Sequence, residues 1–227
     1  MSGGTDMNLY GRQLTGAEIA RGEHRDFVGG LWDELGQLQL GFLTSQGLLP
    51  GHRFVDVGCG ALRGGLHFTR YLEAGGYHGL DINASLIEAG RRELQAAGLG
   101  DRGARLLVDD GFRLQRFDTR FDFGLALSVF THLPMNVIVR CLDGVATSLA
   151  PDGVFFASYF PAPAPAHLAP LLQPPGVVTS HYDRDPFHQS IEEMQWLAGL
   201  CGLQASNLGD WGHPRGQHML AFRRAVP

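Results

Sequence analysis

A glycine-rich turn placed directly after a buried strand constrains this chain more than any other feature. Residues 53–57 predict that strand, Gly58-Cys59-Gly60 follow it, and residues 63–73 predict a helix. Glycine lacks a Cβ, so the backbone of such a turn approaches a ligand closely, and the N–H groups of the helix start point at that ligand. The segment therefore predicts a site for a nucleotide-like or anionic ligand.

Strand and helix patterns alternate along most of the chain. Strands are predicted over residues 77–82, 104–108, 121–128 and 154–159, and helices over 85–97, 134–149 and 190–200. Two last strands, 203–208 and 217–222, are joined by so short a connection that they can only pair antiparallel. The order predicts an α/β fold: a seven-stranded, mostly parallel sheet, with the last strand antiparallel and helices on both faces.

Helical patterns precede the glycine-rich turn. Thr15-Gly16-Ala17-Glu18 has the sequence of a capping box, and residues 26–47 predict one longer helix that Gly29-Gly30 weaken. Pro50-Gly51 ends this region. We expect residues 1–50 to form an N-terminal helical cap, or lid, and residues 51–227 to form one Rossmann-like domain. The proline-rich stretch 161–175 is expected to be a semi-rigid loop of that domain.

Composition and charge argue against several classes of protein. The net charge of −5 opposes a non-specific grip on nucleic acid, which depends on clustered Lys and Arg. Three widely spaced cysteines, Cys59, Cys141 and Cys201, form neither a zinc pattern nor a disulfide framework, which favours a reducing compartment. No stretch approaches the roughly 20 apolar residues of a membrane span, and the first residues contain no apolar signal core. We expect a cytoplasmic protein with no membrane or nucleic-acid partner.

Two ligand classes compete for a turn of this kind. The dinucleotide fingerprint requires a third glycine three residues after Gly60. That position is Arg63, and Gly64 and Gly65 are out of register. The sequence therefore does not fit the dinucleotide fingerprint.

Five segments in order resemble the class I S-adenosylmethionine-dependent methyltransferases. The first is Val55-Asp56-Val57-Gly58-Cys59-Gly60, which is similar to the first motif of that family. The others are Gly79-Leu80-Asp81-Ile82, Val108-Asp109-Asp110-Gly111-Phe112, and the segments 121–128 and 149–154. Together they lie within residues 53–159, and the set is far more specific than any member of it.

The resemblance implies S-adenosylmethionine as cofactor, S-adenosylhomocysteine as product, and a role for each matching residue. Gly58 and Gly60 would flank the methionine part, and Asp81 would accept from both ribose hydroxyls. Asp56 would lie near the cofactor amino group. Either Asp109 or Asp110 would contact adenine N6. The remaining expected cofactor residues are Ile82 and Phe112, which could sandwich adenine or simply pack in the core; Arg63, which could pair with the cofactor carboxylate or face solvent; and Gly111 and Ser128.

The acceptor is expected where the loops leave the carboxyl ends of the strands. Histidine can remove a proton from an acceptor at neutral pH, so loop histidines are candidate bases, although each could be structural. We predict His181, His188 and His213 as catalytic residues, with His132 and His24 as weaker candidates. Apolar contacts could come from Tyr182, Phe187, Trp32 and Trp211, and an acceptor carboxylate could bind Arg184 or Arg215. No clustered carboxylates fall at the strand ends, so no metal is expected.

The preferred hypothesis is a methyltransferase for a small-molecule O or N acceptor, with direct in-line transfer assisted by a loop histidine. Two alternatives stay open at this point. One is a methyltransferase for a peptide or protein side chain. The other is a protein that binds S-adenosylmethionine without transferring its methyl group.

Overall fold

The strand that carries the glycine-rich turn lies in the middle of the sheet. The computed structural model describes residues 9–163 and 168–225. Strand β1 (Phe54–Val57) pairs in parallel with β2 (Tyr77–Asp81) on one side and with β4 (Phe121–Ala126) on the other. Strand β2 pairs in parallel with β3 (Arg105–Val108), and β4 pairs in parallel with β5 (Leu149–Pro161). Strand β10 (His218–Arg224) runs antiparallel between β5 and β9 (Leu203–Asp210), so the order is β3-β2-β1-β4-β5-β10-β9. The predicted mostly parallel sheet with an antiparallel last strand is confirmed.

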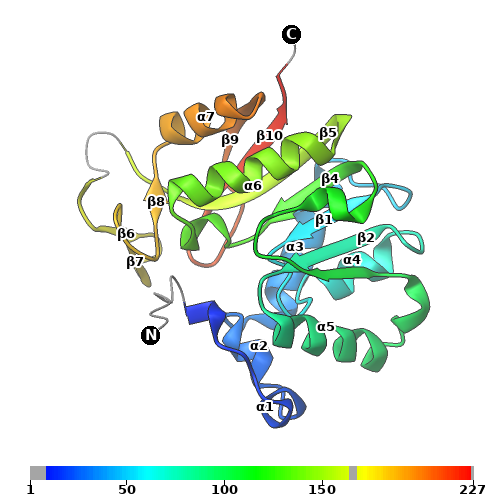
Figure 1. The fold of residues 1–227 in the computed structure, drawn as a ribbon. Helices are drawn as coiled ribbons and strands as arrows, with labels where there is room; N and C mark the ends of the chain where they lie inside the picture. Colours follow the sequence, from blue (N-terminus) through cyan, green and yellow to red (C-terminus); the bar gives the residue numbers. More distant parts are fainter. Residues whose placement is uncertain (1–8, 164–167, 226–227) are drawn as a thin grey trace, which may run out of the picture.

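Helices cover both faces of this sheet (Figure 1). Residues alternate between the faces along a strand, so Val55 and Val57 join one apolar cluster and Phe54 joins the other. The first cluster takes in α6 (Met135–Ser148) and α7 (Ile191–Leu200). The second takes in α3 (Trp32–Ser45), α4 (Gly65–Tyr71) and α5 (Ala84–Ala96). The carboxyl ends of the strands are left for loops and, after β4, for the short 3-10 helix η4 (Phe130–His132). The 3-10 helices η2 (Gly100–Arg102) and η3 (Leu114–Phe117) lie in the connections before and after β3.

The first of the three N-terminal helices begins at a side-chain cap, and the two that follow do not. Helix α1 (Gly16–Ala20) carries the predicted capping box, in which the Thr15 hydroxyl accepts from the Glu18 N–H and the Glu18 carboxylate from the Thr15 N–H. The prediction of one helix over 26–47 is wrong, because α2 (Glu23–Phe27) and α3 are separate. Gly29 and Gly30 have φ of +94° and +63°, which an α-helix cannot contain.

The segment before α3 is tied to α5, beside which α1 and α2 lie (Figure 1). The Glu93 carboxylate accepts from Arg25 through both oxygens and lies 2.8 Å from His24 Nε2. The Asn83 amide donates to the Tyr10 and Arg12 carbonyls, which fixes the 3-10 helix η1 (Leu9–Gly11). Helix α3, by contrast, shares the apolar cluster of β1. The division of the chain at residue 50 stays a prediction.

The stretch between β5 and α7 contains short strands where only a loop was expected. Strands β6 (Leu171–Gln173) and β7 (Val178–Ser180) form a hairpin, and β8 (His188–Gln189) pairs in parallel with the end of β5. Part of the proline-rich stretch, residues 164–167, lies outside the described residues. Within the described chain, no helix combines the length and the hydrophobicity needed to cross a bilayer.

Candidate active site

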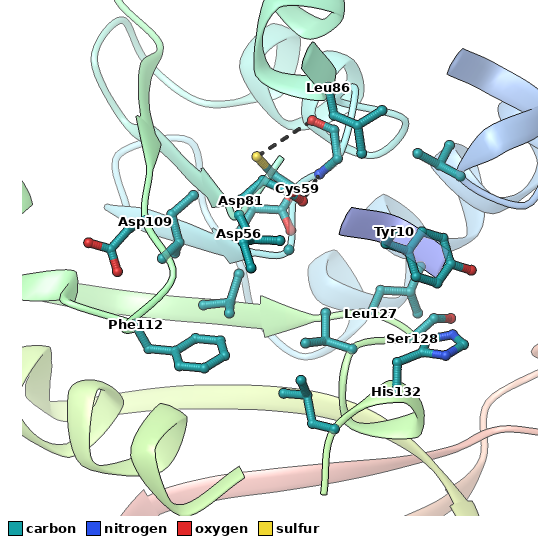
Figure 2. Close-up of a pocket in the computed structure, with 18 of the residues that line it drawn as sticks. Tyr10, Asp56, Cys59, Asp81, Leu86, Asp109, Phe112, Leu127, Ser128 and His132 are labelled. Atoms are coloured by element: carbon teal, nitrogen blue, oxygen red, sulfur yellow. Dashed lines mark hydrogen bonds between the residues drawn. The ribbon is translucent and has the colours of Figure 1, made fainter. Parts of the chain in front are cut away.

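A cavity of about 450 Å³ opens at the carboxyl ends of β1, β2 and β4. Figure 2 shows Asp109 and Phe112 at one end of it, Tyr10, Ser128 and His132 at the other, and Asp56 and Asp81 between them. Ten of the eleven predicted cofactor residues line the cavity: Asp56, Gly58, Gly60, Arg63, Asp81, Ile82, Asp109, Asp110, Phe112 and Ser128. Gly111 is the one that does not. Which of them touch a ligand stays a prediction.

The turn after β1 depends on glycine for two reasons. Gly58 and Gly60 have φ of +70° and +53°, a region that strains other residues. A Cβ on Gly58 would also lie 2.5 Å from Cγ2 of Val129. The N–H groups of Gly58 and Cys59 both donate to the Leu80 carbonyl, so they hold the turn against β2. The turn can therefore offer a ligand the bare Cα surface of its glycines, with these N–H groups already in use.

Asp81 stands at the end of β2 with a carboxylate that its own backbone orients. One oxygen accepts from the Gly60 N–H at 2.9 Å and the other from the Asn83 N–H at 2.8 Å. Burial raises its pKa, against the opposing effect of these backbone donors. Each carboxylate oxygen still has one lone pair to offer, and the side chain lines the cavity. Two adjacent hydroxyls of a ribose fit this pair of acceptors.

Asp56 is the last polar residue of β1 and is only 4% exposed. Its Oδ2 accepts from the Tyr77 hydroxyl at 2.8 Å. Burial raises its pKa to about 7, and the nearby charge of Asp81 adds to the increase. The base of the cavity thus holds two buried carboxyl groups, which favours a ligand that brings positive charge or hydrogen-bond donors.

Asp109 and Asp110, the two alternatives for adenine N6, have different surroundings. The Asp109 carboxylate accepts four hydrogen bonds, from the Gly111 and Arg113 N–H groups and from the Arg113 and Arg116 side chains. Burial alone would raise its pKa, but these donors outweigh burial and lower it to about 2. Its acceptor capacity is used within the chain. Asp110 is more exposed and makes one ion pair, so it has oxygen lone pairs left for an adenine.

Arg63 occupies the position of the missing third glycine and supports the N-terminal segment. Its Nη1 donates to the Val28 carbonyl at 3.0 Å and to the Gly30 carbonyl at 2.9 Å. Burial lowers its pKa to about 10, helped by the nearby charge of Arg215. Arg215 itself donates to the Gly29 carbonyl at 2.7 Å. Two guanidinium groups therefore hold the glycine break between α2 and α3 against the cavity.

The three histidines predicted as catalytic do not line this cavity among the described residues. His188 is buried in β8, where its Nδ1 lies 2.9 Å from the Ser180 hydroxyl. His213 is buried and accepts from the Arg215 N–H, and burial with the charges of Arg215 and Arg63 lowers its pKa to about 4. The backbone of His181 pairs with Phe187. His24, a weaker candidate, packs against Glu93.

Among the histidines that the structure describes, His132 lines the cavity. It ends η4, directly after β4, and its Nδ1 lies 2.6 Å from Oδ1 of Asp185. Its ring meets the Tyr10 ring edge to face, with centroids 4.9 Å apart (Figure 2). His132 was only a weaker candidate for the base in the prediction from sequence, and neither Asp185 nor Tyr10 was among the predicted site residues. The signal available was position, since His132 follows a strand by only a few residues.

The aromatic residues expected around an acceptor also lie elsewhere. Trp32 packs against His24, and Trp211 packs against Phe42, so both stabilise the cap and the sheet edge. Tyr182, Phe187 and the expected arginines, Arg184 and Arg215, are likewise absent from the cavity lining within the described residues. The cavity lining instead includes Val28, Val129, Leu133, Pro134, Val137 and Arg140. No group of three possible metal ligands occurs in the described part of the chain.

Comparisons with known proteins agree on the fold. Residues 54–153 match the family model described as a methyltransferase domain. The CcbJ methyltransferase from Streptomyces caelestis aligns with a TM-score of 0.71 and 14% identity, over 97% of this chain and 100% of that one. Magnesium protoporphyrin IX methyltransferase from Synechocystis PCC 6803, solved with bound S-adenosylhomocysteine, has a TM-score of 0.59 and 17% identity over 86% and 85%. The glycopeptide N-methyltransferase MtfA has 0.62 and 17% over 83% and 90%.

Proposed function

We propose that this chain, which belongs to the class I methyltransferases through its methyltransferase domain at residues 54–153, methylates an oxygen or nitrogen of a small molecule with S-adenosylmethionine. The observation that carries the proposal is the Asp81 carboxylate, which is held by the turn and faces the same cavity as Gly58 and Gly60. That cofactor supplies a methyl group on a sulfonium sulfur. The chain contributes the binding and orientation of both reactants.

The described residues fit the cofactor part by part along the cavity. Asp81 offers acceptors for the ribose hydroxyls, and exposed Asp110 offers one for adenine N6. Ile82 is 56% exposed although it is apolar, and an adenine ring would cover it. Asp56 lies under the turn, where an ammonium group of the methionine part would find a carboxylate. Arg63 lines the cavity close by and is suited to the carboxylate of the same part.

A small acceptor is favoured by the shape of the remaining space. The cavity volume is within the range of small-molecule sites, roughly 300–1,000 Å³, and it must hold cofactor and acceptor together. Tyr10 and Val28 of the N-terminal segment line it, so the segment narrows access to the strand ends. Similar solved enzymes include a magnesium protoporphyrin IX methyltransferase, a mitomycin 7-O-methyltransferase and a glycopeptide N-methyltransferase.

Titration calorimetry with S-adenosylmethionine and S-adenosylhomocysteine tests the cofactor assignment. Asp81→Asn should weaken both by about 10-fold or more, since a hydrogen bond to a charged group contributes roughly 1.5–3 kcal/mol. Asp101→Asn, an exposed position in η2, is the matched control and should bind like the natural chain. No binding by the natural chain would refute the proposal. Turnover of peptides but of no small compound would favour the peptide alternative.

A further inference from the structure

His132 and Asp185 form a pair that two separate parts of the chain bring together. The Nδ1 to Oδ1 distance is 2.6 Å, and the side chains are 23% and 27% exposed. The pair is held by the backbone as well: the Phe187 N–H donates to the Thr131 carbonyl at 2.7 Å, and the His181 N–H donates to the Pro186 carbonyl at 2.8 Å. The loop that carries Asp185 is therefore fastened to the 3-10 helix that carries His132.

The contact with Asp185 determines what the other ring nitrogen can do. A carboxylate beside Nδ1 accepts the proton there, so Nε2 of the neutral ring carries a lone pair. Among the described residues, Nε2 has no hydrogen-bond partner, and His132 lines the cavity. The arrangement leaves a proton-accepting nitrogen at the end of the cavity opposite Asp109 and Phe112 (Figure 2).

The charged groups around this end are of both signs. Asp185 faces the ring from its loop, and Tyr10 faces it from the N-terminal segment. Burial and the charge of Asp185 raise the pKa of Tyr10, while Arg215 and Arg63 act in the opposite direction. Two guanidinium groups therefore reach this end electrostatically. They favour an acceptor that becomes negative over one that enters as an ammonium ion.

We propose that His132, oriented by Asp185, is the general base and that the acceptor atom is a hydroxyl oxygen. The inference rests on the proposed function and makes it more specific. Nε2 takes the hydroxyl proton while a lone pair of that oxygen forms the new bond to the methyl carbon. The bond between carbon and sulfur breaks, and its electron pair returns to sulfur. The positive charge lost from sulfur appears on the imidazolium, beside the Asp185 carboxylate.

A hydroxyl acceptor explains why a base with a carboxylate partner is present. An alcohol or phenol is a weak nucleophile until its proton leaves, and a positioned base contributes roughly 10²–10⁴-fold to such a step. A neutral amine has a free lone pair and can attack before any proton is lost. A histidine held by a carboxylate at this position, as His132 is by Asp185, is therefore most useful for methylation of an oxygen.

Methyl transfer to paired acceptors tests the proposal with the full-length chain. The probes are phenol, catechol and benzyl alcohol, each compared with the amine of the same skeleton, and S-adenosylhomocysteine release is measured from pH 5 to 9. The variants are His132→Gln, His132→Ala and Asp185→Asn. Asp183→Asn is the matched control, because Asp183 lies on the same loop, is exposed and does not line the cavity.

We expect hydroxyl probes to be methylated and His132→Gln to lower kcat by about 10²–10⁴-fold while cofactor affinity is kept. The pH dependence of kcat should change when His132 is replaced. Asp185→Asn, which keeps His132, should change it as well and serves as the second variant if His132→Gln does not fold. Imidazole should restore part of the activity of His132→Ala, which a purely structural role would not allow. Asp183→Asn should match the natural chain.

Three results would overturn the inference. One is methylation of amine probes without any hydroxyl probe, and another is cofactor binding with no hydroxyl probe methylated. The third is a His132→Gln or Asp185→Asn variant whose kcat and pH profile equal those of Asp183→Asn. In each case cofactor binding by calorimetry can still succeed, so failure of this inference is distinguishable from failure of the proposed function.

Discussion

Replacing Asp56 by Asn should change the stability of this protein in a pH-dependent way. The carboxyl group is 4% exposed, and burial raises its pKa from the ordinary value of 3.8 to about 7. The folded state therefore binds the proton more tightly than the unfolded state does. Such a group contributes stability that is fully present below pH 3.8 and is lost as the pH rises through about 7. Each pH unit of separation corresponds to about 1.36 kcal/mol, so the loss is about 4 kcal/mol at pH 8.

Asn at position 56 has nearly the same shape and can still accept from the Tyr77 hydroxyl, but it does not titrate. The free energy of unfolding of Asp56→Asn minus that of the natural chain should therefore rise by about 4 kcal/mol between pH 4 and pH 8. Any constant cost of an unpaired amide group cancels in this comparison. Urea denaturation of both proteins at the two pH values measures it, with exposed Asp101→Asn as control. An equal difference at pH 4 and pH 8 would refute the reasoning.

Three further predictions concern the turn and its supports. Gly58→Ala should lose more stability and cofactor affinity than Gly98→Ala: both positions have positive φ, which costs about 1–2 kcal/mol, but only the first meets Val129. Thermal melts and calorimetry compare them. Asp109→Asn should lower the free energy of unfolding at pH 7 by about 2 kcal/mol. The low pKa of Asp109, about 2, gives stability that is lost only as the pH falls toward 2. The difference in stability between variant and natural chain should therefore be smaller in thermal melts at pH 3 than at pH 7. Glu93→Gln should cost about 1–3 kcal/mol and loosen the N-terminal segment, measured by hydrogen exchange.

The central strands β1, β4 and β5 were predictable because each contains a short, mostly apolar run bounded by turn residues. That pattern has a purely local cause, since a strand buried on both faces needs apolar side chains throughout. The short strands between β5 and α7 escaped prediction because two or three residues, such as His188–Gln189, carry no periodicity. Gly29-Gly30 signalled the break before α3. The helical spacing of Leu31, Leu35, Leu38 and Phe42 nevertheless favoured one continuous helix in the prediction.

The sequence predicted the residues at the cofactor end of the cavity better than those at its acceptor end. Gly58 and Gly60 closely follow β1, Asp81 ends β2, and the Gly60 N–H donates to the Asp81 carboxylate. The acceptor end depends on a contact between positions 53 residues apart, Asp185 and His132. No local pattern specifies that the loop after β7 folds back onto η4. Its own backbone bonds and the Phe187–Thr131 bond decide it.

Distance from a strand end nevertheless separates His132 from His181 and His188, and it is readable from sequence. His213 follows β9 by three positions and does not line the cavity, but β9 is the edge strand and not a neighbour of β1. A residue that follows a strand by a few positions stays at the sheet edge, because the strand fixes its backbone. Each further loop residue adds up to about 3.3–3.6 Å of reach and many more possible directions. His132 follows the end of β4 by six positions, whereas His181 and His188 come twenty or more positions after β5. His181 and His188 were predicted from the polar character of their loop. In the structure the same loop supplies Asp185, the partner of His132, and His132 is positioned by the strand that it follows.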